Sequence, residues 1–297
     1  MTGCFSFSPS LKYRPDVSDR GHIYEDFSVR YFTSVLSVGF LALMTFPVMS
    51  DVSRGIAALE AGDVLGSVQE FQAAFEAGDG DGAFYIGRLF EVGLGTEQDM
   101  RRATELYAAA VSEDSALAQN RLGLMHLNGE FVLQDYKRAA ELLCAAADQG
   151  DANGQFNCGL LYSEGRGVEQ DADRAFEYWM SAAEGKHVAA INYVAQSYRD
   201  GTGVEQDPVR AAGYFGVTAA AGNPMGLLEL AKAHANGAGV DLDQVKAHGY
   251  ANLAAVRGVD EARILRDELA LQMDAEALEA AQAFAREWQA TPLEQAG

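Results

Sequence analysis

One spacing constrains this chain more than any other feature, because the same residues return every 36 positions. Three residue types recur five times in this register: Gly93, Gly129, Gly165, Gly201 and Gly237; Asp99, Asp135, Asp171, Asp207 and Asp243; and Ala103, Ala139, Ala175, Ala211 and Ala247. A fourth position is basic in every copy: Arg102, Arg138, Arg174, Arg210 and Lys246. A repeat of this length is typical of solenoids, whose units bury their apolar faces only against neighbouring units.

The copy at residues 152–185 predicts two helices. Its first helix, over residues 152–163, has apolar residues at helical spacing. Gly165 and the glycine-rich loop end this helix, and Asp171 caps the second one. Gly159 lies in mid-helix, where glycine costs up to ~1 kcal/mol relative to alanine. We therefore expect a neighbouring helix to approach closely at Gly159.

The copies share the pattern Gly-x-x-Tyr-x-x-Gly-x-Gly-Val-x-x-Asp-x-x-Arg-Ala-x-x-Tyr-x-x-x-Ala-Ala, seen most clearly at residues 159–183. It resembles the Sel1-like repeat, a relative of the tetratricopeptide repeat. Five copies cover residues 81–259, a half-repeat precedes them at 51–80, and a helical segment at 260–290 suits a terminal cap. The resemblance implies an all-α fold, a right-handed superhelical α-solenoid of two-helix repeats.

Residues 35–49 form an uncharged apolar segment with Arg30 before it and Ser50 after it. This arrangement is typical of a signal peptide, and cleavage after Ser50 would place the protein in the periplasm or outside the cell. Signal peptides normally begin a chain, so we expect Val29 to be the true start and residues 1–28 not to be translated. The alternative is an uncleaved anchor in the inner membrane.

The net charge of −21 resides entirely on residues 51–297, since acidic and basic residues cancel in the first 50. Such a surface repels nucleic acid and anionic membranes, because binding to them requires basic side chains. We therefore expect no nucleic-acid partner and no membrane insertion after cleavage. We also expect a protein or peptide partner and a monomeric chain.

Signals for an enzyme are poor. The chain contains neither His-Glu-x-x-His nor Gly-x-Ser-x-Gly. Its Gly-x-Gly loops lack the preceding strand and the Gly-Lys-Ser/Thr sequence of a phosphate-binding loop. His126 and His234 fall in a slot that is aromatic in other copies, and no metal-ligand spacing is present. We expect no catalytic residues, no cofactor and no metal.

Cys144 and Cys158 lie nearly symmetrically about the turn at residues 150–151. They would form a disulfide if the two helices approach closely enough, and otherwise Cys158 would be a buried free thiol. Some Sel1-repeat proteins carry a bridge in most repeats and have been linked to penicillin binding. This chain lacks that regular pairing.

By similarity to tetratricopeptide arrays, the first helices line a concave groove. Counting from the mid-helix glycine, the groove-facing residues are Phe84, Arg88, Asn120, Leu124, Leu127, Phe156, Leu160, Asn192, Gln196, Arg199, Leu228 and Lys232. The leucines of the second and third repeats would form an apolar centre with Phe156, flanked by basic residues, which suits an extended or helical peptide. The alternative is that these positions belong to the core.

These features predict an exported scaffold or regulatory adaptor of the bacterial envelope. Two alternatives remain open at this point. One is a hydrolase related to the cell wall or to β-lactams, and the other is a structural subunit of an envelope complex.

Overall fold

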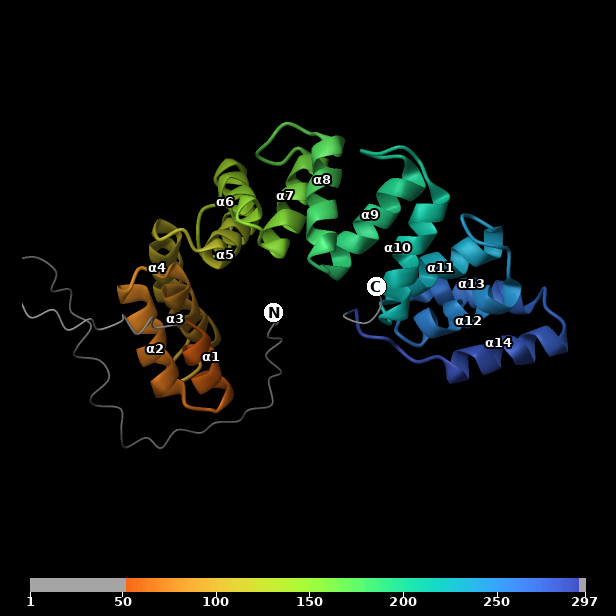
Figure 1. Cartoon of the computed structure of the whole chain (residues 1–297), viewed down its shortest axis with the longest axis horizontal. Coiled ribbons are helices and arrows are strands. Elements are labelled where there is room, and N and C mark those ends of the chain that lie inside the picture. The colour runs from red at the N-terminus through yellow and green to blue at the C-terminus, as the bar shows by residue number, and fades with distance from the viewer. Residues whose placement is uncertain (1–51, 294–297) are drawn as a thin grey trace, which may run out of the picture. The chain divides into compact units, whose positions relative to one another are not determined.

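The computed structural model describes residues 52–293, which lie in a single compact unit, Val48–Gly297. This part of the chain consists of helices and contains no strand (Figure 1). The helices are α1 (Val52–Glu60), α2 (Val64–Glu76), α3 (Gly80–Val92), α4 (Met100–Ser112), α5 (Ala116–Asn128), α6 (Tyr136–Asp148), α7 (Ala152–Glu164), α8 (Ala172–Glu184), α9 (Val188–Asp200), α10 (Pro208–Ala220), α11 (Pro224–Asn236), α12 (Gln244–Ala255), α13 (Asp260–Ala270) and α14 (Ala275–Glu287). The predicted all-α solenoid is confirmed.

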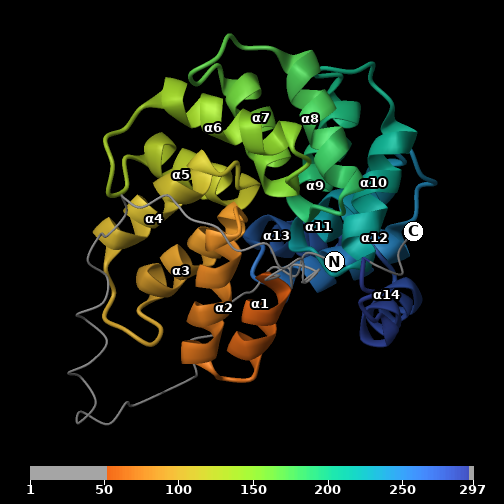
Figure 2. The same cartoon turned by 60° about the vertical axis from the view of Figure 1, so that its left-hand side comes forward.

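Helices α1 to α13 pack one on the next in chain order, and the pairs α3–α4 to α11–α12 are the five repeats (Figures 1 and 2). Contacts also run between first helices of neighbouring repeats, from α3 to α5 and from α5 to α7. The first helices of the first three repeats are therefore neighbours of one another as well as of their own second helices.

The repeated aspartate and glycine are the two helix caps of each copy. The aspartate side chain accepts a hydrogen bond from a free backbone N–H in the first turn of each second helix, as Asp171 does from Arg174 at 3.0 Å. The glycine ends each first helix in the left-handed region, with φ of 68° at Gly165 and 66° at Gly237. The 36-residue register thus marks where helices begin and end.

The mid-helix glycines lie where the second helix of the same repeat packs closest, as expected. A Cβ atom on Gly159 would lie 2.5 Å from Nε1 of Trp179. At Gly87 it would meet Tyr107 at 2.7 Å, and at Gly123 it would meet Leu143 at the same distance. A large side chain of the second helix therefore occupies the space that each glycine leaves.

The second glycine of the loop allows a close approach to the preceding repeat. A Cβ atom on Gly167 would lie 1.9 Å from the carbonyl oxygen of Tyr136, at the start of the preceding repeat's second helix. In the second repeat this glycine is replaced by Phe131, which keeps a positive φ of 60° and is 67% exposed. The replacement places a strained backbone and an apolar side chain at the surface.

The ends of the solenoid differ in detail from the sequence prediction. The described part of the segment predicted as a half-repeat contains two helices, α1 and α2, because Val52, Ile56 and Leu59 pack together against Phe71. The segment predicted as a cap also contains two helices, α13 and α14. No helix within residues 52–293 is both long and apolar enough to cross a membrane. The predicted signal peptide and the start at Val29 lie outside the described residues.

Candidate protein-binding face

We use the name first-helix face for the surface formed by the predicted groove positions of α3, α5, α7, α9 and α11. Arg199 is exposed, and nine other predicted residues are half-buried: Phe84, Arg88, Asn120, Leu124, Leu127, Phe156, Leu160, Gln196 and Lys232. Asn192 and Leu228 are buried. Ten of the twelve residues therefore keep some surface that a partner could contact.

The middle of this face is apolar. Leu124 and Leu127 pack against the buried cluster that contains Leu143 and Leu161, and each remains half-buried. Each of these leucines thus has one flank in the core between repeats and one flank in solvent. These side chains therefore take part in the core, as one of the two alternatives from the sequence expected, and they also keep exposed area.

Phe156 and Leu160 continue the apolar centre into the third repeat. Both pack against the buried cluster around Trp179. The ring of Phe156 stacks on His187 with centroids 4.7 Å apart, and it meets Tyr193 edge-on at 5.4 Å. These contacts hold the half-exposed Phe156 ring in place, so this part of the surface is preorganised.

The end of the face nearest α3 carries a cluster of charges around Glu91. This carboxylate accepts hydrogen bonds from Arg88 at 2.6 Å, from Arg121 of the next repeat, and from the hydroxyl of Tyr107. Burial by itself would raise the pKa of Glu91, but the hydrogen bonds from Arg121 and Tyr107 and the nearby positive charges outweigh it and lower that pKa. Glu91 is therefore ionised, and two arginines surround one carboxylate.

The opposite end carries a second cluster around Glu229, whose side chain is 8% exposed. Arg199 donates to Glu229 at 2.6 Å and Lys232 donates to it at 2.8 Å. Lys232 also pairs with Glu261 at 2.8 Å. Burial by itself would lower the pKa of Lys232, but its hydrogen bonds to the two glutamates raise it. Arg199 also pairs with Asp200. The basic charge here is therefore fully neutralised locally.

The sequence reasoning missed the glutamate–arginine pairs that cross between repeats. Glu91 pairs with Arg121, and Arg199 pairs with Glu229, each across 30 positions and with the signs exchanged. Opposite charges 30 residues apart were the signal that could have found them. At the equivalent positions, the second and third repeats have Leu127 and Asn157, and the third and fourth repeats have Ser163 and Tyr193. The centre of the face is therefore free of such pairs, while both ends have one.

Two predicted contact residues are corrected by the structure. The amide of Asn192 accepts a hydrogen bond from Thr218 at 2.7 Å and donates one to Asn223 at 3.1 Å, and the residue is 6% exposed. Leu228 is 1% exposed and belongs to the core of the last repeat. Both side chains hold neighbouring helices together, so neither offers a surface to a partner.

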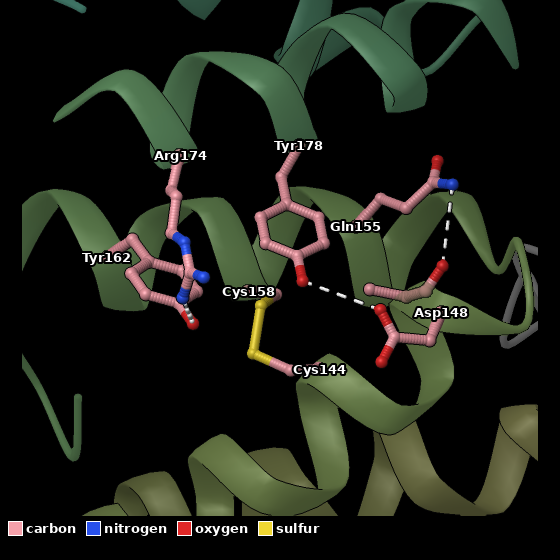
Figure 3. The surroundings of a disulfide bond; sticks show 8 residues. Cys144, Asp148, Gln155, Cys158, Tyr162, Arg174 and Tyr178 are labelled. Atoms are coloured by element: carbon pink, nitrogen blue, oxygen red, sulfur yellow. Dashed lines mark hydrogen bonds between the residues drawn. A yellow bond between two sulfur atoms is a disulfide. The ribbon is translucent and has the colours of Figure 1, made fainter. Parts of the chain in front are cut away.

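Cys144 of α6 and Cys158 of α7 form a disulfide bond, with Cα atoms 5.0 Å apart (Figure 3). The helices approach closely because Gly154 has no side chain, since a Cβ atom there would lie 2.7 Å from that of Ala146. Close by, the hydroxyl of Tyr178 donates to Asp148 at 3.4 Å. The bridge joins the second repeat to the third, the two repeats that supply the apolar centre.

The histidines of the aromatic slot have structural partners. Nδ1 of His126 lies 3.1 Å from the carbonyl oxygen of Leu133, and Nδ1 of His234 lies at the same distance from that of Asp241. The ring of His234 also stacks on Tyr250. Within residues 52–293, no three His, Cys, Asp or Glu side chains gather in a way that could hold a metal ion. What this surface provides is apolar contact area and charge.

The profile of the Sel1 repeat matches five consecutive segments, residues 80–115, 116–151, 152–187, 188–223 and 224–258. Among solved structures, a Sel1 repeat protein from Oxalobacter formigenes is similar over 81% of this chain and 98% of its own, with 24% identity and a TM-score of 0.68. The uropathogenic Escherichia coli protective antigen c5321, which has the same repeat fold, is similar over 77% of this chain and 57% of its own, with 21% identity and a TM-score of 0.53. No curated protein matches the chain.

The five matched segments follow the helix pairs α3–α4 to α11–α12 and cover more than half of the chain. The Sel1 repeat is a protein-interaction scaffold, and proteins built from it are generally not enzymes. The chain belongs to the Sel1-repeat family.

Proposed function

We propose that this protein is an exported scaffold of the bacterial envelope, which binds a peptide segment of a partner protein along the first-helix face. The observation that carries the proposal is the apolar centre, where Leu124, Leu127, Phe156 and Leu160 stay half-exposed on neighbouring first helices. Apolar side chains held in place by a core are typical anchors for a partner's side chains.

The charges at the ends of the face favour a particular kind of segment. Arg88 and Arg121 together carry one more positive charge than Glu91 neutralises, in a protein whose net charge is −21. An acidic side chain of the partner would be attracted to this end, while the partner's apolar residues cover the centre. The partner segment is therefore apolar with an acidic residue beside its apolar stretch.

Export is supported by two features that are independent of each other. The apolar segment at residues 35–49 is followed by the small residue Ser50, as in a signal peptide. The disulfide between Cys144 and Cys158 belongs in an oxidising compartment, because the bacterial cytosol keeps most thiols reduced. Both favour the periplasm or the outside of the cell over the cytosol.

Site-specific photo-crosslinking in the source bacterium tests the binding proposal. Benzoylphenylalanine replaces Leu124 in one variant and Leu65 in another, since Leu65 is 64% exposed on α2 and outside the first-helix face. We expect a single protein adduct from position 124, absent at position 65, whose crosslinked peptide is apolar with an acidic residue. Equal adducts at both positions, or none at 124, would reject this face as the binding site.

The export proposal has its own test. The protein is recovered from periplasmic, membrane and culture fractions, and its N-terminus is sequenced. We expect an N-terminus at Asp51 in a soluble fraction. An intact chain held in the membrane fraction would instead support an uncleaved anchor, and an intact chain in the cytosol would refute export.

A further inference from the structure

A cleft of about 540 Å³ lies at the C-terminal end of the described unit, away from the first-helix face. Helix α12 packs against both α13 and α14, whereas α13 and α14 make few contacts with each other. The space between them stays open, with α12 as its floor. Its volume falls in the range of about 300 to 1,000 Å³ that is typical of small-molecule sites.

The floor of the cleft contains a polar group without a partner. His248 of α12 lines the cleft and is 3% exposed, and its Nδ1 atom is buried with no hydrogen-bond partner among the described residues. Buried polar groups in proteins are nearly always hydrogen-bonded, so an unsatisfied one calls for an explanation. Burial lowers the pKa of His248, the charge of Arg266 lowers it further, and Asp267 partly opposes both. The ring is therefore neutral at pH 7 and adds no charge to the cleft.

The charged residues of the cleft favour an anion. Arg266 and Arg286 line it together with a single carboxylate, Asp267. Arg266 donates to Asp267 at 2.7 Å, while Arg286 in the last turn of α14 forms no ion pair within residues 52–293. The lining therefore has a net positive charge in a strongly acidic protein. An unpaired arginine at the edge of a cleft is suited to a carboxylate, which it binds through two parallel hydrogen bonds.

The remaining walls of the cleft are mostly apolar. Leu253 of α12 and Val256, the residue that follows this helix, lie on one side, and Leu278 of α14 lies on another. Val256 is 73% exposed, although it is large and apolar. A ligand that covered Val256 would remove this apolar surface from water, which is favourable at roughly 25 cal/mol per Å². The cleft thus combines an anion-binding end with an apolar wall.

We propose that the cleft between α12, α13 and α14 binds an organic carboxylate with an apolar body. The carboxylate pairs with Arg286 near His248, and the apolar body covers Leu253, Val256 and Leu278. Two sources share this chemistry: a free organic acid, and the C-terminal carboxylate of a peptide that ends in an apolar residue. This site is separate from the first-helix face and does not depend on the function proposed for it.

Isothermal titration calorimetry of the full chain tests the site with two acids and their neutral counterparts. The probes are octanoate and octanamide, and the peptide acetyl-Ala-Ala-Leu as its free acid and as its amide. We expect at least one acid to bind saturably and its amide not to bind. Binding of octanoate alone would identify a free organic acid as the source, and binding of the peptide acid alone would identify a protein C-terminus.

Two matched variants locate the binding. Arg286→Gln removes the unpaired cation, and because its side chain has no ion-pair partner among the described residues the fold is unaffected. We expect it to weaken binding by at least about tenfold, because the carboxylate loses both of its charge-assisted hydrogen bonds to Arg286. Arg263→Gln is the control, since Arg263 is exposed on α13, pairs with Asp260 and does not line the cleft. The proposal is overturned if neither acid binds, if the amides bind equally well, or if Arg286→Gln binds as tightly as the unaltered protein.

Discussion

The substitution Gly159→Ala tests whether the mid-helix glycines exist to admit the second helix. In an isolated helix this change is favourable by up to ~1 kcal/mol, because alanine has the higher helix propensity. In this protein the new Cβ atom would lie 2.5 Å from Nε1 and 2.6 Å from Cδ1 of Trp179, and 3.1 Å from the carbonyl oxygen of Ala175. The two effects have opposite signs, so their magnitudes decide the outcome.

The clash is the larger effect, because its surroundings cannot move easily. Trp179 is 6% exposed and packs in the largest apolar cluster of the third and fourth repeats. Inserting a methyl group into a well-packed core typically costs about 1 to 3 kcal/mol. After subtraction of the propensity gain, we expect Gly159→Ala to lower the free energy of unfolding by roughly 0.5 to 2 kcal/mol.

Gly213→Ala is the matched control, because it is the same substitution within a helix of the next repeat. Gly213 is exposed in α10, and a Cβ atom there would have no neighbour within 4 Å. Only the propensity effect acts at this position, so we expect a gain of about 0.5 to 1 kcal/mol. Urea unfolding followed by circular dichroism at 222 nm measures both variants. If Gly159→Ala were as stable as Gly213→Ala, the close-packing explanation of these glycines would be refuted.

Three further predictions concern other parts of the solenoid. The bond between Cys144 and Cys158 closes a loop of 14 residues, and its reduction should lower the free energy of unfolding by about 2 to 4 kcal/mol. Unfolding with and without dithiothreitol measures this change. A variant with both cysteines changed to alanine should not respond to the reductant. Because the pKa of Glu91 is lowered in the folded protein, its contribution to stability is complete above the ordinary pKa of 4.5 and is lost as the pH falls through the lower folded value. The free energy of unfolding should therefore decrease less steeply with falling pH for Glu91→Gln than for the unaltered protein. Identical curves for the two proteins would contradict this. Phe131→Gly removes the strain of a positive φ at a residue whose side chain is 67% exposed, which should stabilise the fold by about 1 kcal/mol. The midpoint of thermal unfolding should therefore rise by a few degrees. A lower midpoint would show that the Phe131 side chain is needed for folding.

The helices and their ends could be predicted from the sequence because they depend on local chemistry. Asp171 caps its helix through a backbone N–H three residues away, and Gly165 adopts the left-handed conformation at its own position. Such interactions recur wherever the residues recur, so the period of 36 was enough to place them. The all-α solenoid followed because each helix pair has an apolar side that only a neighbouring pair can cover.

The surface available to a partner could not be predicted as well, because exposure depends on how neighbouring repeats pack. Leu160 and Leu228 occupy nearby positions in their first helices, but Leu160 is half-buried and Leu228 is 1% exposed. In the last repeat α12, α13 and α14 gather around the core to which Leu228 belongs. The helical period alone cannot show which flank of a residue a neighbouring helix will cover.

The sequence by itself determined the repeat, the helix caps, the family and the excess of acidic charge, since each of these depends on residues close together in the chain or on a simple sum. The tertiary structure decided the disulfide, the ion pairs that join Glu91 to Arg121 and Arg199 to Glu229, and the open cleft beside His248. Each of these depends on how closely and at what angle helices approach one another. That approach is set by the fit of many side chains together, such as Trp179 against Gly159, and no local pattern contains it.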